Sequence, residues 1–190
     1  MIKNILFLLL FSPLWSVAAS ASGTWQKKWC VESESDQYSV TSLGGDTLEI
    51  LAPKGLTLWY RQMLKGDMTA EYDACVMDEG RDGDRLSDMN FFWMASDPQA
   101  KDIWTRMASR KGVFANCSQL QLYYLGYGGN YNTTTRFRRY HGEPKPPIVK
   151  EYTDADHLLK PNHWYHIRIQ SLKGLVSVYV DGELIEKYRN

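Results

Sequence analysis

Short segments in which apolar and polar residues alternate recur along most of the chain, and clusters of Gly, Pro, Asn and Asp separate them. Successive side chains of a β-strand point to opposite faces, so this period of two predicts strands, and the clusters predict turns. The predicted strands cover residues 47–52, 56–60, 68–77, 90–95, 120–127, 133–140, 164–170 and 176–180. The pattern therefore predicts an all-β fold built from antiparallel sheets.

One short helix is the exception. Residues 98–111 follow helical spacing, which would place Ile103, Trp104 and Met107 on one face, with Gly112 as the stop. A chain of 190 residues is long enough for one domain with a substantial core. Because 22 Lys and Arg balance 22 Asp and Glu, the chain lacks the overall positive charge of a non-specific nucleic-acid binder. We therefore expect no nucleic-acid partner.

Residues 1–21 have the layout of a secretory signal peptide. A short head containing Lys3 precedes an apolar run over 5–17, and small residues follow at 18–21. The run is too short and wrongly flanked for a membrane-spanning helix. We expect cleavage after Ala19 or Ala21, which leaves a domain over 22–190 that is secreted or periplasmic and has no membrane partner.

The C-terminal part carries a resemblance to known domains. Residues 164–169 read Trp-Tyr-His-Ile-Arg-Ile, and residues 176–182 read Val-Ser-Val-Tyr-Val-Asp-Gly. Such a segment resembles the end of concanavalin A-like lectin and glucanase domains. The resemblance implies a jelly-roll β-sandwich of two antiparallel sheets whose concave sheet binds carbohydrate.

Further strings extend this resemblance over nearly the whole chain after the leader. They lie at 84–95, 123–130, 132–140 and 151–154, and together they resemble a family of exported bacterial concanavalin A-like domains of unsettled activity. That family is associated with polysaccharide degradation, which implies a polysaccharide or oligosaccharide ligand. Its members continue with a further segment and a closing strand, so the resemblance implies that this chain lacks its last strand or strands.

Two arginines share one face of the strand predicted over 133–140. Alternation places Arg136 and Arg138 on the same side as Thr134 and Tyr140. Guanidinium groups bind carboxylates in bidentate fashion, so one interpretation is a subsite for a uronic acid or a sulfate. The other is structural pairing with acidic residues of the chain, for which the candidates are Glu71, Asp73, Asp84 and Asp88.

Aromatic residues form a second candidate surface. Seven Trp and twelve Tyr are more than a core needs, because both side chains carry a polar tip. Tyr123 and Tyr127 share a face and lead to Asn130, so they are candidates for stacking on sugars, whereas Tyr124 would point into the core. A purely structural role for all three tyrosines is the alternative. Asp88 and Asn90 are further candidates for contacts with sugar or with the arginines.

Three functions fit these residues. In a lyase acting by β-elimination, Arg136 and Arg138 would neutralise a uronate carboxylate while Tyr123 or His141 removes the adjacent proton. A glycoside hydrolase would need two carboxylates across a cleft, again from Glu71, Asp73, Asp84 and Asp88. The Glu-x-Asp-x-x-Glu motif of glucanases is absent from the sequence. The third function is a non-catalytic lectin-like module, and an inactive truncated copy of the enzyme is its variant.

Neither a metal nor another cofactor is expected from the sequence. The acidic loop at 78–84 departs from the helix-loop-helix calcium template, because Gly80 and Met89 stand where oxygen ligands belong. We therefore favour a solvated turn there, with calcium as the alternative. Three cysteines permit at most one internal disulfide, and we favour three buried small apolar residues.

Overall fold

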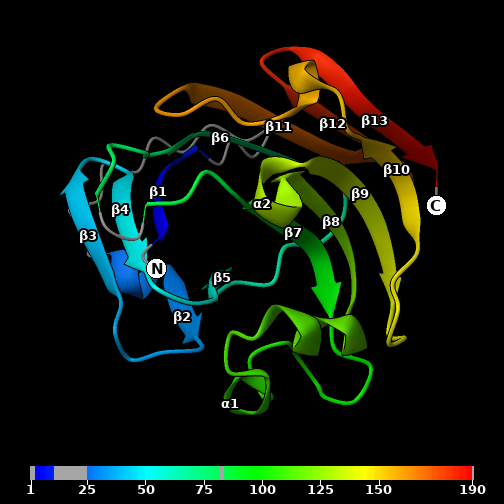
Figure 1. Ribbon diagram of the computed structural model, residues 1–190. Helices are drawn as coiled ribbons and strands as arrows, with labels where there is room; N and C mark the ends of the chain where they lie inside the picture. Colours follow the sequence, from blue (N-terminus) through cyan, green and yellow to red (C-terminus); the bar gives the residue numbers. More distant parts are fainter. Residues whose placement is uncertain (1–2, 11–24, 82–83, 190) are drawn as a thin grey trace.

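The computed structural model describes residues 3–10, 25–81 and 84–189, and it shows two antiparallel sheets packed as a jelly-roll β-sandwich (Figure 1). The larger sheet has the strand order β13-β12-β11-β6-β1-β4-β3, the smaller sheet β10-β9-β8-β7, and β2 pairs with β5 as a separate ribbon. The larger sheet consists of β1 (Lys3–Leu10), β3 (Ser39–Gly44), β4 (Thr47–Ala52), β6 (Met68–Val76), β11 (Trp164–Leu172), β12 (Leu175–Val180) and β13 (Glu183–Arg189). The smaller sheet consists of β7 (Met89–Ser96), β8 (Gln121–Gly128), β9 (Thr134–His141) and β10 (Ile148–Tyr152), and the ribbon of β2 (Trp29–Ser33) and β5 (Leu56–Tyr60). The predicted all-β jelly roll is confirmed.

The main core lies between the two sheets. Alternation along β11 and β12 turns residues such as Ile167 and Val178 inward, and both are fully buried. The smaller sheet contributes aromatic rings from every second position, among them Trp93, Tyr123 and Phe137. Full burial of one such apolar side chain is worth roughly 1.5–3 kcal/mol, so this cluster is the main source of stability.

A second buried cluster covers the opposite face of the smaller sheet. Its members come from the sheet, from the ribbon and from the segment 97–119: Cys30, Trp59, Ile103, Cys117, Leu120, Leu122, Tyr124 and Tyr140. Strand β8 is consequently buried on both faces from Leu122 to Gly128. The ribbon and the segment 97–119 therefore form a second layer over this sheet, and the site described below lies in that layer.

Each predicted strand has a counterpart in the structure, and the bounds of β4 and β5 are as predicted. The helix prediction is wrong for most of its length, because only Met107–Arg110 (α1) of the predicted range 98–111 is helical. Elsewhere there are a short turn α2 (Gly129–Asn132) and 3-10 turns at 25–27, 114–119 and 155–157. The Asp97 carboxylate accepts the backbone N–H of Gln99 at 2.9 Å and pairs with Arg106 at 3.3 Å. These contacts fold residues 97–106 into irregular turns.

Strand β1 is formed by part of the predicted leader. Its backbone pairs antiparallel with β4 on one side and with β6 on the other. The predicted cleavage sites after Ala19 and Ala21 lie outside the described residues, so cleavage stays a prediction. Within the described ranges, no helix is long and apolar enough to cross a membrane.

Candidate functional site

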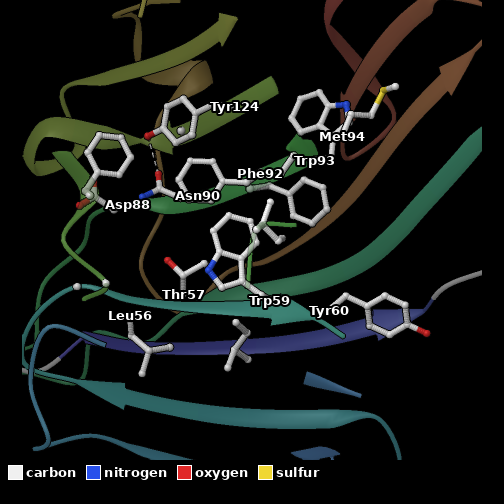
Figure 2. Close-up of a pocket in the computed structure, with 18 of the residues that line it drawn as sticks. Leu56, Thr57, Trp59, Tyr60, Asp88, Asn90, Phe92, Trp93, Met94 and Tyr124 are labelled. Carbon is white, nitrogen blue, oxygen red and sulfur yellow. Dashed lines mark hydrogen bonds between the residues drawn. The ribbon is translucent and has the colours of Figure 1, made fainter. Parts of the chain in front are cut away.

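A groove of about 750 Å³ opens on the outer face of the smaller sheet, between β7, β8 and β9 on one side and β5 with the segment 103–114 on the other (Figure 2). Nine aromatic residues line it: Trp29, Trp59, Tyr60, Phe91, Phe92, Trp93, Trp104, Phe114 and Tyr124. Its polar lining includes Asp88, Asn90, Asn130, Arg136 and Arg138. We call this cavity the groove throughout.

The aromatic rings form a continuous wall. Trp59 of β5 stacks on Phe92 of β7 with ring centroids 5.7 Å apart, and Figure 2 shows the two side chains next to each other. Tyr124 lies 5.4 Å from Phe92 and 5.4 Å from Phe114. Trp59 is only 4% exposed, whereas Phe114 is 47% exposed. The wall is therefore rigid at Trp59 and open to solvent at Phe114.

A buried carboxylate fixes the position of Trp59. Glu32 Oε2 accepts hydrogen bonds from Trp59 Nε1 at 2.8 Å and from Arg110 Nη2 at 2.9 Å, and Glu32 Oε1 accepts the N–H of Gly112 at 3.1 Å. Arg110 also donates to the carbonyl of Ile103 at 2.6 Å. These bonds join β2, β5 and the segment 103–112, so one network holds two walls of the groove.

Polar groups on the sheet side of the groove are ordered by neighbouring side chains. The Tyr124 hydroxyl donates to Asn90 Oδ1 at 2.8 Å, and Figure 2 shows this bond. Burial raises the pKa of Tyr124 well above its usual value. Asp88, with φ of 61°, pairs with Arg85 at 3.2 Å. A hydroxyl, an amide and an ion pair therefore follow one another along this side.

Arg136 and Arg138 both line the groove, on the same face of β9 as alternation predicts. Arg136 pairs with Glu151 of β10, and Arg138 Nη1 donates to the carbonyl of Pro146 at 2.6 Å. The Arg136 charge thus has a carboxylate partner on the neighbouring strand. Arg138 bonds to a neutral carbonyl and has no carboxylate partner among the described residues, so its charge is compensated less.

The acidic residues considered as partners of these arginines lie elsewhere, apart from Asp88. Glu71 and Asp73 stand on β6 of the larger sheet, where Asp73 contacts His166 at 2.8 Å. Asp84 organises the turn after β6, since its carboxylate accepts the backbone N–H of Glu79 at 2.8 Å. That hydrogen bond is the main reason why the pKa of Asp84 is lowered. Residues 82 and 83 of the acidic loop lie outside the described part of the chain.

Three predicted site residues do not reach the groove. Tyr123 and Tyr127 point into the main core and are 2% and 3% exposed, because the face of β8 that they share is the inner one. The expectation that Tyr123 shares a site with Arg136 is therefore wrong, and of the three β8 tyrosines only Tyr124 lines the groove. His141 is exposed at the end of β9 and does not line the groove.

The five other predicted residues do line the groove: Asp88, Asn90, Asn130, Arg136 and Arg138. Sequence reasoning missed most of its aromatic wall, above all Trp59 and Phe114. The only signal for this wall was the number of Trp and Tyr residues, because Phe114 lies in the irregular segment 97–119, where no periodicity assigns a face.

Few of the residues that line the groove carry groups that could act in catalysis or bind a metal. Asp88 is the only carboxylate among the described residues that line it, and no histidine lines it. Nor do the described residues contain a cluster of three His, Cys, Asp or Glu side chains able to hold a metal ion. All three cysteines are free and buried, which confirms their interpretation as small core residues, and burial raises the pKa of Cys117 to about 12.

Comparison with known proteins gives one family and one structural likeness. A family model described as "Domain of unknown function (DUF6250)" matches residues 50–190. Among solved structures, the chain is similar to the carbohydrate-binding module CBM66 from Bacillus subtilis, with 11% sequence identity and a TM-score of 0.35. That likeness covers 86% of this chain and 80% of the module. No curated protein matches the sequence significantly.

Proposed function

The chain belongs to the DUF6250 family, and from the groove itself we propose that it is a carbohydrate-binding domain. The observation that carries this proposal is the combination of an aromatic wall with amide, carboxylate and guanidinium groups in one cavity. Sugars present apolar C–H faces and a rim of hydroxyls, so they need flat apolar partners together with hydrogen-bonding groups. The groove supplies both.

The number of carboxylates that line the groove favours binding over hydrolysis. A glycoside hydrolase needs two of them across the scissile bond, about 5–9.5 Å apart. Of the described lining residues only Asp88 carries one, and Arg85 pairs with it. The other acidic residues considered from the sequence stand on the larger sheet or in the turn after β6. We therefore favour a non-catalytic module.

We propose an acidic glycan as the ligand, with Arg138 as the contact for its carboxylate or sulfate. Arg136 has Glu151 as its partner, whereas Arg138 donates its hydrogen bond to the Pro146 carbonyl. A charge-assisted hydrogen bond to an anionic sugar is worth roughly 1.5–3 kcal/mol. One such contact would raise the affinity for an acidic over a neutral sugar about 10- to 100-fold.

The test is affinity electrophoresis of the full chain in gels that contain alginate, polygalacturonate or a neutral galactomannan, followed by titration calorimetry with the polymer that retards it most. We expect retardation by an acidic polymer, weakened by salt because exposed charges are screened. Arg138→Gln should lose about 10-fold or more in affinity. The matched control is Arg168→Gln, on β11 of the larger sheet, which should bind normally.

The aromatic wall is tested in the same assay. Phe114 and Trp164 are each 47% exposed, but only Phe114 lines the groove. A stacking ring contributes about 0.5–1.5 kcal/mol, so Phe114→Ala should weaken binding roughly 2- to 10-fold. Trp164→Ala should leave it unchanged. Equal losses in the two variants, or no retardation of the wild type by any polymer, would refute the proposal.

Cleavage of an acidic glycan by β-elimination is the second candidate function. One observation favours it: the Tyr124 hydroxyl lies on the same face of the sheet as Arg136 and Arg138, bonded to Asn90. The raised pKa of Tyr124 opposes it, because a base must lose its proton at working pH. The lyase predicts an unsaturated product that absorbs ultraviolet light, and Tyr124→Phe would abolish it. If an acidic polymer retards the chain but no unsaturated product forms, the lyase is ruled out and the non-catalytic binding module stands.

A further inference from the structure

The turn between β8 and β9 holds three consecutive residues in the left-handed backbone region. Their φ angles are 53° at Asn130, 59° at Tyr131 and 57° at Asn132. In Figure 1 this turn is labelled α2 (Gly129–Asn132), although its central residues are not right-handed. Asn tolerates this conformation, but a bulky side chain such as Tyr is strained there. The position of Tyr131 therefore calls for a reason.

Hydrogen bonds on both sides hold the turn in place. Asn132 Oδ1 accepts the N–H of Leu159 at 2.8 Å, and Asn132 Nδ2 donates to the carbonyl of Leu159 at 2.9 Å. Asn130 Nδ2 donates to Thr133 Oγ1 at 3.0 Å, and the Thr133 hydroxyl donates to the Asn130 carbonyl at 2.7 Å. These bonds fix the backbone around Tyr131, and none of them involves its ring.

The turn presents the Tyr131 ring to solvent at the rim of the groove. Tyr131 is 70% exposed, although its side chain is large and mostly apolar. The Arg85 guanidinium lies 5.2 Å from its centroid and also pairs with Asp88, which lines the groove. The residue before Tyr131, Asn130, lines the groove as well. The ring is thus held by a cation next to the place where a ligand would leave the cavity.

We infer that Tyr131 is a stacking platform for a sugar residue that extends beyond the groove. This inference rests on the proposed function. Backbone strain of this kind persists where the surrounding bonds over-determine it, and it clusters at ligand contacts. An exposed flat ring offers its face to the C–H side of a sugar, and Arg85 restricts its orientation. The subsite would accept any pyranose face, so it adds affinity for long chains.

The variant Tyr131→Asn removes the ring without disturbing the backbone turn, because Asn adopts the left-handed conformation readily. It therefore separates the effect of the ring on binding from any effect on the fold. Affinity for the polymer that the wild type binds should fall about 2- to 10-fold, while a short oligosaccharide of the same polymer, which fills only the groove, should bind unchanged. The melting temperature should stay the same or rise. Tyr131→Phe should bind as the wild type does. Tyr38→Asn serves as the control, since Tyr38 is exposed and lies outside the groove.

Each outcome decides between the two proposals. Unchanged polymer affinity in Tyr131→Asn, or an equal loss for the short oligosaccharide and the polymer, would overturn the stacking role while leaving the groove as the binding site. A lower melting temperature with unchanged affinity would show that the ring is structural. Failure of the wild type to bind any polymer would instead refute carbohydrate binding itself, and the platform with it.

Discussion

Replacing Glu32 by alanine removes the acceptor that joins the ribbon to the segment 103–112. Glu32 is 4% exposed, and the change strands three buried donors, those of Trp59, Arg110 and Gly112. Removing one partner of a buried ion pair costs about 3–5 kcal/mol. Asp97 still lies 3.6 Å from Arg110, so part of the charge stays compensated and we expect a value near the lower end.

The assay is urea unfolding, followed by tryptophan fluorescence, of the wild type and of Glu32→Ala. The control is Glu71→Ala, which removes a half-buried carboxylate 4.0 Å from Arg168 at the protein surface. Exposed pairs contribute about 1 kcal/mol or less, so this variant should unfold almost as the wild type does. Because domains are stable by only about 5–15 kcal/mol, a loss near 3 kcal/mol moves the midpoint clearly.

A double-mutant cycle with Arg110→Ala separates the ion pair from the other bonds of Glu32. Coupling between the two positions should be at least about 1.5 kcal/mol, because the charges are buried and 2.9 Å apart. Two results would refute the reasoning. One is a loss in Glu32→Ala as small as that in Glu71→Ala, and the other is additivity of the two single changes.

Two further predictions concern the packing of Gly126 and the reactivity of the buried thiols. Gly126→Ala would place a Cβ 2.0 Å from the buried Tyr124 hydroxyl, so we expect a loss of about 1–3 kcal/mol in unfolding and weaker glycan retention. Gly129→Ala, where the nearest atom is 3.6 Å away, is the tolerated control, and equal losses would contradict this account. Burial raises the pKa of every thiol, that of Cys117 to about 12, so a thiol reagent at neutral pH should label the chain only after denaturation. Rapid labelling of native Cys117 would show that this thiol is accessible.

Alternation predicted most strands of this fold but could not assign the faces of β8. That strand is buried from Leu122 to Gly128, so its pattern carries no contrast between an inner and an outer side. The sequence therefore could not decide whether Tyr123 or Tyr124 faces the groove. On β9, by contrast, Phe137 is buried between two arginines, and that contrast placed Arg136 and Arg138 on one face.

Strands with an unusual polar residue or an exposed face were missed. In β2 the inward positions are Cys30 and Glu32, and a charged residue at an inward position reads as an outward one. Every residue of β10 except Tyr152 is exposed, so it has no apolar face to detect. The helix predicted over 98–111 was wrong because this segment folds around the ion pairs of Asp97 with Arg106 and of Arg110 with the distant Glu32, which apolar spacing does not reveal.

Strand β1 makes the order of folding and export consequential. Its residues belong to the predicted leader, yet their backbone is paired on both sides within the larger sheet. A leader has to be accessible to the translocation machinery, so a chain that folds first would bury the segment that the machinery recognises. Cleavage at the predicted sites would then remove a central strand and leave β4 and β6 with facing rows of unpaired N–H and C=O groups. If the chain is exported as predicted, translocation would therefore have to precede closure of this sheet.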